Sequence, residues 1–160
     1  MKLFLIRHAE AIDYGTGTVK SDDYRFITPK GRKASLTVFK KLKYEFLELD
    51  KIFSSPLIRS VQTAEILAST LKFRFDVEVN NELHISSSYA DVPAFVKRNS
   101  IFGSVALVGH NPMMELLLKE FSGKLIPFAK SGVACVDFDL TKMTGKFLWY
   151  MNPKTFELTK

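Results

Sequence analysis

The stretch LFLIRHAEA, residues 3–11, decides the fold and also raises the question of function. Four consecutive apolar residues predict a buried strand over residues 2–6. The strand then ends directly on Arg7 and His8, two side chains that are costly to bury without partners. We therefore expect the first strand to lead into a site that supplies partners for both of these groups.

Strand and helix patterns alternate along the rest of the chain. Further strands are predicted at 51–54, 73–79 and 104–108, followed by a hairpin over 133–140 and 146–151. Helices are predicted at 28–46, 57–71, 91–97 and 112–121. The first helix has Thr28 as its N-cap and Pro29 in its first turn. Apolar residues at four-residue intervals, ending with Phe46, predict its buried face. This alternation predicts an α/β fold, a three-layer α/β/α sandwich with a mostly parallel central sheet.

Length and composition indicate a single folded domain, residues 1–160. The chain has 160 residues, of which 46% are hydrophobic and 25% are charged, and these values are typical of globular proteins. A chain of this length buries one substantial core but not two. No connecting segment is long enough to form a substantial lid, so the loops 13–25 and 84–93 are the candidate walls of any site.

The charge and cysteine content limit the class of partner and the compartment. A net charge of +6 favours an anionic ligand, but the lysines are scattered and form no basic stripe for nucleic acid. Cys135 is the one cysteine, which excludes an intrachain disulfide and a zinc site built on cysteine pairs. Because no apolar run reaches the length of a signal-peptide core or a membrane span, we expect a cytoplasmic protein with no membrane partner.

Cationic groups follow three of the predicted strands. Arg7 and His8 follow the first strand, Arg59 lies in the first turn of the helix after the second, and His110 follows the fourth. Ligands in open parallel sheets bind outside the carboxyl ends of the strands, so we expect these four side chains to converge. Such a cluster repels itself unless an anion lies at its centre. A phosphate group suits such a pocket.

Four motifs resemble those of the histidine phosphatase superfamily, whose fold is phosphoglycerate mutase-like. They are RHAEA at 7–11, TPKG at 28–31, SSPLIRSVQTAEIL at 54–67 and VGHNP at 108–112. The motifs occur in the expected order and span the first 112 residues. Within the superfamily, the short chain is similar to the SixA branch of phosphohistidine phosphatases.

The resemblance implies that His8 is the nucleophile and that Arg7, Arg59 and His110 hold the phosphoryl oxygens. This agrees with the chemistry, because a phosphoryl group in transfer spreads negative charge over oxygens that positioned donors stabilise. His8 must attack as a neutral imidazole while an acceptor, such as a backbone carbonyl, holds the proton of its other nitrogen. No cofactor is implied. A metal is not expected either, because the metal-binding motif H-E-x-x-H is missing and the arginines would repel a cation.

Several other polar residues have both a functional and a structural interpretation. Glu82 in NNELH is the candidate general acid for an alkoxide leaving group, and the alternative is a solvated loop carboxylate. Glu10 is a candidate partner for one of the site arginines, and the alternative is a salt-bridged surface residue. Ser55 is a candidate hydroxyl in the pocket, and the alternative is a serine that only terminates its strand. His84 and Asn111 are interpreted as structural.

Three functions remain open at this stage. The first is removal of phosphate from phosphohistidine in a protein, which an open pocket without a lid favours. The second is hydrolysis of a small phosphomonoester, which would require Glu82 as the acid. The third is a phosphoprotein-binding module without catalysis.

Overall fold

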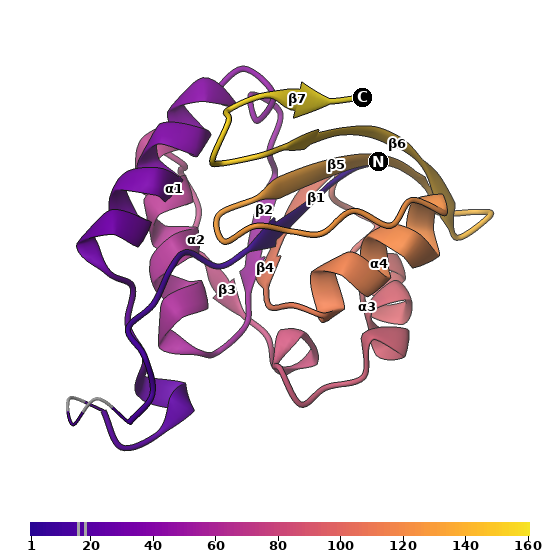
Figure 1. The fold of residues 1–160 in the computed structure, drawn as a ribbon. Coiled ribbons are helices and arrows are strands. Elements are labelled where there is room, and N and C mark those ends of the chain that lie inside the picture. The colour runs from indigo at the N-terminus through magenta and orange to yellow at the C-terminus, as the bar shows by residue number, and fades with distance from the viewer. Residues whose placement is uncertain (16, 18) are drawn as a thin grey trace.

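The computed structural model describes residues 1–15, 17 and 19–160, so residues 16 and 18 of the predicted wall 13–25 lie outside the described residues (Figure 1). The described chain contains a seven-stranded sheet with the order β3-β2-β4-β1-β5-β6-β7. Its strands are β1 (Lys2–Arg7), β2 (Lys51–Ser54), β3 (Glu78–Val79), β4 (Ser104–Gly109), β5 (Val133–Asp139), β6 (Thr144–Met151) and β7 (Leu158–Thr159). The α-helices are α1 (Pro29–Lys41), α2 (Ile58–Leu71), α3 (Val92–Arg98) and α4 (Met113–Ser122). Short 3₁₀ helices are η1 (Asp22–Tyr24), η2 (Asn81–Leu83) and η3 (Tyr89–Asp91).

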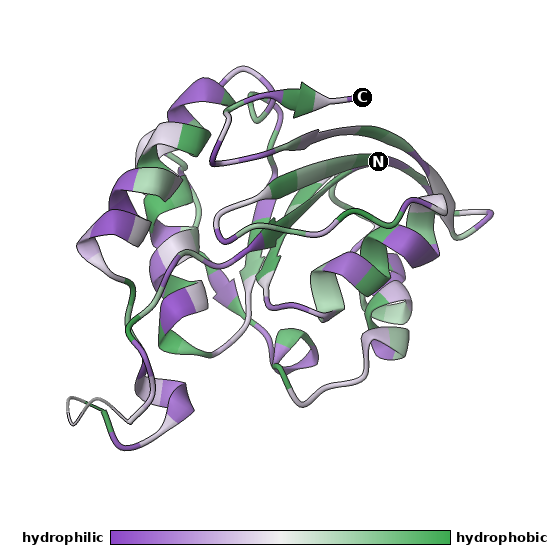
Figure 2. Cartoon of the chain, viewed as in Figure 1, coloured by the Kyte–Doolittle hydropathy of each residue, from purple (hydrophilic) through white to green (hydrophobic). Residues whose placement is uncertain are grey.

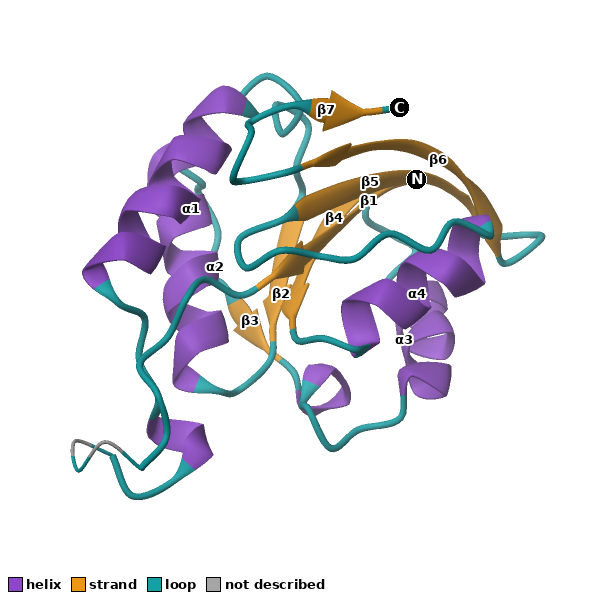
Figure 3. Ribbon diagram, in the orientation of Figure 1, coloured by secondary structure: helices purple, strands orange, loops and turns teal. Residues whose placement is uncertain are grey.

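The sheet combines a parallel half with an antiparallel half (Figure 3). The pairs β1–β4, β2–β4 and β2–β3 are parallel, as the alternation of strands and helices predicts. The pairs β1–β5, β5–β6 and β6–β7 are antiparallel, because the chain returns through the predicted hairpin and then adds β7. The sheet is therefore mixed, and the description as mostly parallel applies to its first four strands.

The central strand β1 is buried on both faces, which explains its four consecutive apolar residues. Leu3 and Leu5 belong to the core under α3 and α4, whereas Phe4 and Ile6 belong to the core under α1 and α2. All four side chains are fully buried. The helices lie on opposite faces of the sheet and turn their apolar sides toward it, which confirms the three-layer prediction (Figure 2). Among the described residues, no helix has the length and apolar character needed to cross a membrane.

The first helix is shorter than the predicted segment 28–46. It ends at Lys41, where the backbone of Leu42 leaves the helical conformation, and turns carry the chain on to β2. Phe46 is nevertheless buried, and its ring lies 4.6 Å from the ring of Phe4 between centroids. The apolar spacing therefore predicted correctly that Phe46 is buried. It did not predict the end of the helix, because a turn that leads back to the sheet can bury the same side chain.

The predicted strand 73–79 is also shorter in the structure. It is reduced to β3, because β2 is a four-residue strand and pairs only its last two residues with Glu78 and Val79. Phe75 is largely exposed and stacks edge-on against Phe73, with 5.7 Å between ring centroids. The alternating apolar pattern of this segment reflects a small aromatic contact at the sheet edge.

Candidate active site

The carboxyl ends of β1, β2 and β4 lie at one edge of the sheet. The register pairs Arg7 of β1 with Gly109 of β4, so His8 and His110 leave their strands side by side. The backbone N–H of His8 donates to the carbonyl of Gly109 at 2.9 Å, and the two imidazole rings are 5.0 Å apart between centroids. Arg59 is the second residue of α2 and acts electrostatically on both histidines. The predicted convergence therefore extends to the nucleophile candidate, one arginine and the second histidine.

The imidazole of His8 is held in one tautomer. Its Nδ1 lies 2.7 Å from the carbonyl oxygen of Ala9. Because a carbonyl oxygen only accepts, Nδ1 carries the proton and Nε2 keeps its lone pair. Burial, followed by the positive charges of Arg59 and Arg7, lowers the pKa of His8 to about 3 against the opposing effect of the Ala9 hydrogen bond. His8 is therefore a neutral base at physiological pH.

His110 is the more deeply buried of the two histidines, with 1% of its surface exposed. Its Nε2 lies 2.7 Å from the hydroxyl of Ser55 and 3.2 Å from the hydroxyl of Ser60. Burial, followed by the electrostatic interactions with His8 and with the positive charge of Arg59, lowers its pKa to about 2. The ring is therefore neutral, and the two serines hold its Nε2 edge in place.

Arg59 is almost fully buried and is held by the loop that precedes α1. Its two terminal nitrogens donate to Asp22, one to the backbone carbonyl and one to the carboxylate, each at 2.8 Å. The other carboxylate oxygen of Asp22 accepts from Arg25 at 3.0 Å. Asp22 therefore takes the place expected for Glu10, and the planar end of Arg59 contacts Asp22.

Arg7 is held by the segment that precedes β5. One terminal nitrogen donates to the carbonyl of Phe128 at 2.6 Å, and the same carbonyl accepts from the amide of Asn111 at 3.2 Å. The carboxylate of Glu115 accepts from that amide and from the backbone N–H of Phe128, at 2.5 and 2.9 Å. Asn111 therefore joins the turn after β4 to the segment that positions Arg7, in line with its structural interpretation.

The three residues predicted to hold phosphate each have a buried polar atom without a hydrogen-bond partner, which is rare in folded proteins. In the described part of the chain, five buried side-chain polar atoms have no hydrogen-bond partner, and three of these belong to this group. They are Nε of Arg7, Nε of Arg59 and Nδ1 of His110. The two arginine Nε atoms are donors, and Nδ1 of His110 is a donor in the tautomer in which a serine hydroxyl donates to its Nε2. Because buried polar groups are almost always hydrogen-bonded, this concentration indicates donors that serve an acceptor from outside the chain.

The packing of α1 places the loop after the nucleophile. The hydroxyl of Thr28 caps the helix by accepting from the backbone N–H of Gly31 at 2.9 Å and donates to Glu10 at 3.1 Å. A Cβ atom at position 31 would lie 2.3 Å from the backbone oxygen of Glu10, so only glycine permits this close approach. The TPKG motif therefore fixes Glu10 against α1, away from Arg59.

Glu82 and His84 lie on η2 and in the turn that follows it. The carboxylate of Glu82 forms an ion pair with Arg98 of α3, and His84 accepts from the backbone N–H of Ser86 at 3.1 Å. Contacts of Glu82 therefore favour the structural interpretation over the role of acid. Within the described residues, no three side chains of the His, Cys, Asp and Glu types lie close enough together to hold a metal ion.

Several residues around the site carried no functional assignment from the sequence. The hydroxyl of Thr63 accepts from the backbone N–H of Ala9 at 3.0 Å and donates to the carbonyl of Arg59 at 2.7 Å, linking the nucleophile loop to α2. Thr63 lies four positions after Arg59, so helical spacing within the 54–67 motif was a usable signal for this residue. Ser60 directly follows Arg59 and had no such signal. Asp22 had no such signal, because its loop has no periodicity.

The two buried neutral histidines predict that the protein loses stability in mild acid. Their folded pKa values of about 3 and about 2 lie below the unfolded value of 6.5, so the unfolded chain binds protons first as the pH falls below 6.5. At pH 5, each histidine should lower the free energy of unfolding by about 2 kcal/mol. Urea unfolding at pH 7 and pH 5 measures this loss.

The matched variants for this measurement are His8→Gln and His84→Gln. His8→Gln should lose about 2 kcal/mol less than the natural chain between the two pH values. His84→Gln, which changes a partly exposed histidine, shows how far the histidine-to-glutamine change itself alters stability at pH 7. An unchanged pH dependence in His8→Gln would contradict the neutral, buried state of this imidazole.

Known proteins resemble this chain in sequence and in fold. A solved structure of the protein histidine phosphatase SixA complexed with tungstate superimposes with a TM-score of 0.88 at 28% identity, covering 98% of this chain and 100% of that chain. Phosphohistidine phosphatase SixA of Escherichia coli (strain K12) is 29% identical over 165 residues, which cover 100% of this chain and 99% of that protein. The mitochondrial serine/threonine-protein phosphatase Pgam5 of Drosophila melanogaster is 31% identical over 78 residues, 49% of this chain and 26% of that protein.

The sequence profile of the histidine phosphatase superfamily (branch 1) matches residues 3–84. This range is about half of the chain and runs from β1 through η2. It contains the RHAEA, TPKG and SSPLIRSVQTAEIL motifs, and the similarity to SixA extends over the remaining strands and helices. The chain therefore belongs to branch 1 of the histidine phosphatase superfamily.

Proposed function

We propose that the protein removes the phosphoryl group from a phosphohistidine of a partner protein by way of a phosphohistidine formed on His8. The observation that carries this proposal is the set of three unpartnered buried donors, on Arg7, Arg59 and His110, beside a neutral imidazole. An oxyanion would satisfy all three donors. The similarity to the SixA sequence and to the SixA structure named above, which cover 100% and 98% of this chain, supports the choice of phosphohistidine as substrate.

In the proposed first step, Nε2 of His8 attacks phosphorus while the bond between phosphorus and the substrate nitrogen breaks. A substrate imidazole protonated on its other nitrogen leaves as neutral imidazole, so the enzyme need not supply a proton. In the second step, water attacks the phosphorus on His8, which releases inorganic phosphate and restores the lone pair of Nε2. The donors of Arg7, Arg59 and His110 stabilise the charge on the equatorial oxygens in both steps.

The surroundings of the site support a substrate presented on a protein surface. The walls next to the site are short, and the loop around Asp22 contacts Arg59 directly. Without a long lid segment, the site would admit a phosphorylated side chain that projects from a folded domain. A cytoplasmic location is part of this proposal, on the basis of the single, buried and unpaired Cys135.

The experiment that tests the proposal uses a phosphotransfer domain phosphorylated on histidine. The protein should release inorganic phosphate from it, and quenching in base should trap phosphate on the peptide that contains His8. This modification should be stable in base and lost in acid, and mass spectrometry locates it. Phosphate release without phosphate on His8 would exclude the covalent mechanism. Tight binding without any release would instead support a phosphoprotein-binding module.

Glu82→Gln tests the alternative in which the protein hydrolyses small phosphomonoesters. Because Glu82 pairs with Arg98, we expect turnover to stay within about twofold, far below the effect of removing a general acid. The measurement compares a phosphohistidine peptide with an aryl phosphate whose leaving group is poor. Glu78→Gln, which breaks the Glu78–Lys51 ion pair on β3, is the matched control. A large loss on the aryl phosphate alone would favour the small-molecule reading, and a large loss on both substrates would remove the case for a phosphohistidine substrate.

A further inference from the structure

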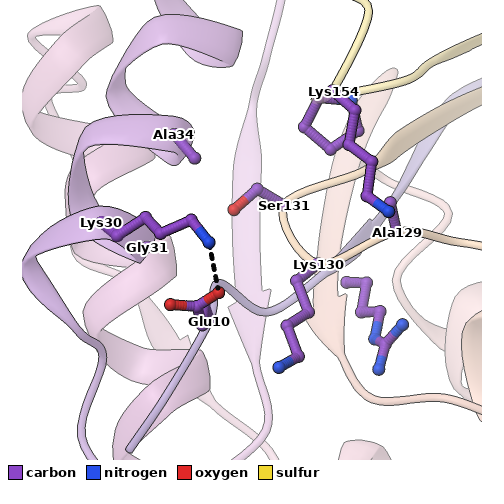
Figure 4. A pocket seen from close by; sticks show the side chains of 10 residues that line it. Glu10, Lys30, Gly31, Ala34, Ala129, Lys130, Ser131 and Lys154 are labelled. Carbon is purple, nitrogen blue, oxygen red and sulfur yellow. Dashed lines mark ion pairs between the residues drawn. The ribbon is translucent and has the colours of Figure 1, made fainter.

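A cavity of about 670 Å³ lies beside Arg7 at the same edge of the sheet as the candidate active site (Figure 4). Its walls come from the loop after β1, from the first turns of α1, from the segment before β5 and from the turn after β6. The charged residues among them are Arg7, Glu10, Lys30, Lys130 and Lys154. We call this cavity the lysine cavity.

One wall of the lysine cavity is hydrogen-bonded to the backbone of the nucleophile. The N–H of Ser131 in its wall lies 3.2 Å from the carbonyl oxygens of both Arg7 and His8. The hydroxyl of Ser131 is fully buried and bonds the hydroxyl of Ser35 in α1 at 2.8 Å, which joins two opposite walls. The cavity and the phosphoryl site are therefore neighbours, with Arg7 on the border of both.

The cavity carries an excess of positive charge. Lys30 points toward Glu10, at 3.4 Å, while Lys130 and Lys154 extend from the opposite walls (Figure 4). In the described part of the chain, neither Lys130 nor Lys154 forms an ion pair with a carboxylate. The hydrogen bond from Thr28, together with Lys30 and Lys130, holds the pKa of Glu10 below its usual value. Four cationic side chains thus face one carboxylate, and a further anion is attracted to the cavity.

We propose that the lysine cavity binds acidic side chains that flank the phosphohistidine in the substrate protein. This inference rests on the proposed function, since it assigns a binding site to the residues next to the phosphohistidine whose phosphoryl group is transferred to His8. The volume falls within the range of binding pockets, so it accommodates several side-chain groups at once. Three exposed lysines favour an acidic partner over a neutral one by electrostatic complementarity.

The test compares three phosphoryl donors. One is a phosphohistidine peptide flanked by aspartate and glutamate, and the second is the same peptide flanked by asparagine and glutamine. The third is phosphoramidate, which has the phosphorus–nitrogen bond without any flank. The protein should prefer the acidic peptide over the neutral peptide by about tenfold or more in kcat/KM, and added salt should reduce this preference.

The variants are the triple substitution Lys30→Gln, Lys130→Gln and Lys154→Gln and a control of equal charge. The control changes Lys97, Lys119 and Lys124, exposed lysines on and after the helices of the opposite face. The cavity variant should lose the preference through a higher KM, with kcat unchanged. It should also hydrolyse phosphoramidate at the natural rate, which shows that it is folded. The control variant should keep the preference.

Three results would overturn the inference. They are an absence of preference for the acidic peptide in the natural protein, an equal loss in the control variant, and a preserved preference in the cavity variant. Each leaves phosphoramidate hydrolysis intact and so leaves the proposed function standing. Failure of the natural protein to hydrolyse either peptide or phosphoramidate would instead refute the proposed function. Preference for a small carboxylated phosphate ester over the acidic peptide would assign the cavity to a small molecule.

Discussion

His8→Ala should lower the turnover of a phosphohistidine substrate by about 10⁵-fold or more, the size of effect seen when a covalent nucleophile is removed. The alanine methyl group has no lone pair to attack phosphorus, and no phosphorylated intermediate can form. The donors on Arg7, Arg59 and His110 remain, so a tungstate or phosphate anion should still bind. Single-turnover phosphate release, together with anion binding by calorimetry, measures the two effects separately.

The control for this experiment is His84→Ala, which removes a partly exposed imidazole bonded to Ser86. It should retain turnover within about twofold, because its ring bonds the side chain of Ser86 and does not bond the arginines proposed to hold the phosphoryl oxygens. Appreciable turnover in His8→Ala would show that water attacks the substrate phosphorus directly, and the covalent mechanism would be abandoned.

Arg59→Ala should lower kcat by roughly 10²- to 10³-fold, the usual loss for removing one positioned donor of an oxyanion site. Arg59→Lys should restore little of this activity, because an ammonium group lacks the planar donors that Arg59 directs at Asp22 while keeping Nε free. Steady-state kinetics on a phosphohistidine peptide gives the loss. Thermal unfolding of each variant separates a lost donor from a lost fold.

Asp22→Asn distinguishes holding Arg59 in place from binding phosphate directly. The asparagine keeps an oxygen toward Arg59 but removes the charge shared with Arg25, so the loss in kcat should be smaller than in Arg59→Ala. A variant Arg59→Lys with activity within tenfold of the natural protein would show that Arg59 contributes only charge. A larger loss in Asp22→Asn than in Arg59→Ala would show that Asp22 has a further role.

Elements with periodic sequence were predictable, and the contacts that place the loops were not. The four apolar residues of β1 predicted burial on both faces, and the strand ends predicted that His8 and His110 would meet. Both results follow from local pattern plus the geometry of parallel strands. Phe46 was correctly predicted as buried but wrongly placed in a helix, since turns and helices bury a side chain equally well.

The partner of Arg59 shows why site geometry needs the whole fold. Glu10, two residues after the nucleophile, was a plausible partner by sequence proximity. The structure uses Asp22, because η1 brings an aperiodic loop over the start of α2. Thr28 and Gly31 meanwhile hold Glu10 against α1. No local pattern reports which of several carboxylates a long side chain will reach.

The position of β1 in the sheet also affects the order in which the protein can fold during synthesis. This strand leaves the ribosome before the other strands of the sheet, yet its partners are β4 and β5, which begin only at Ser104 and Val133. Local contacts can therefore form early, while the apolar strand β1 waits with both edges unpaired until β4 has emerged and with one edge unpaired until β5 has emerged. Translation that pauses before residue 133 should leave a nascent chain that depends on chaperones.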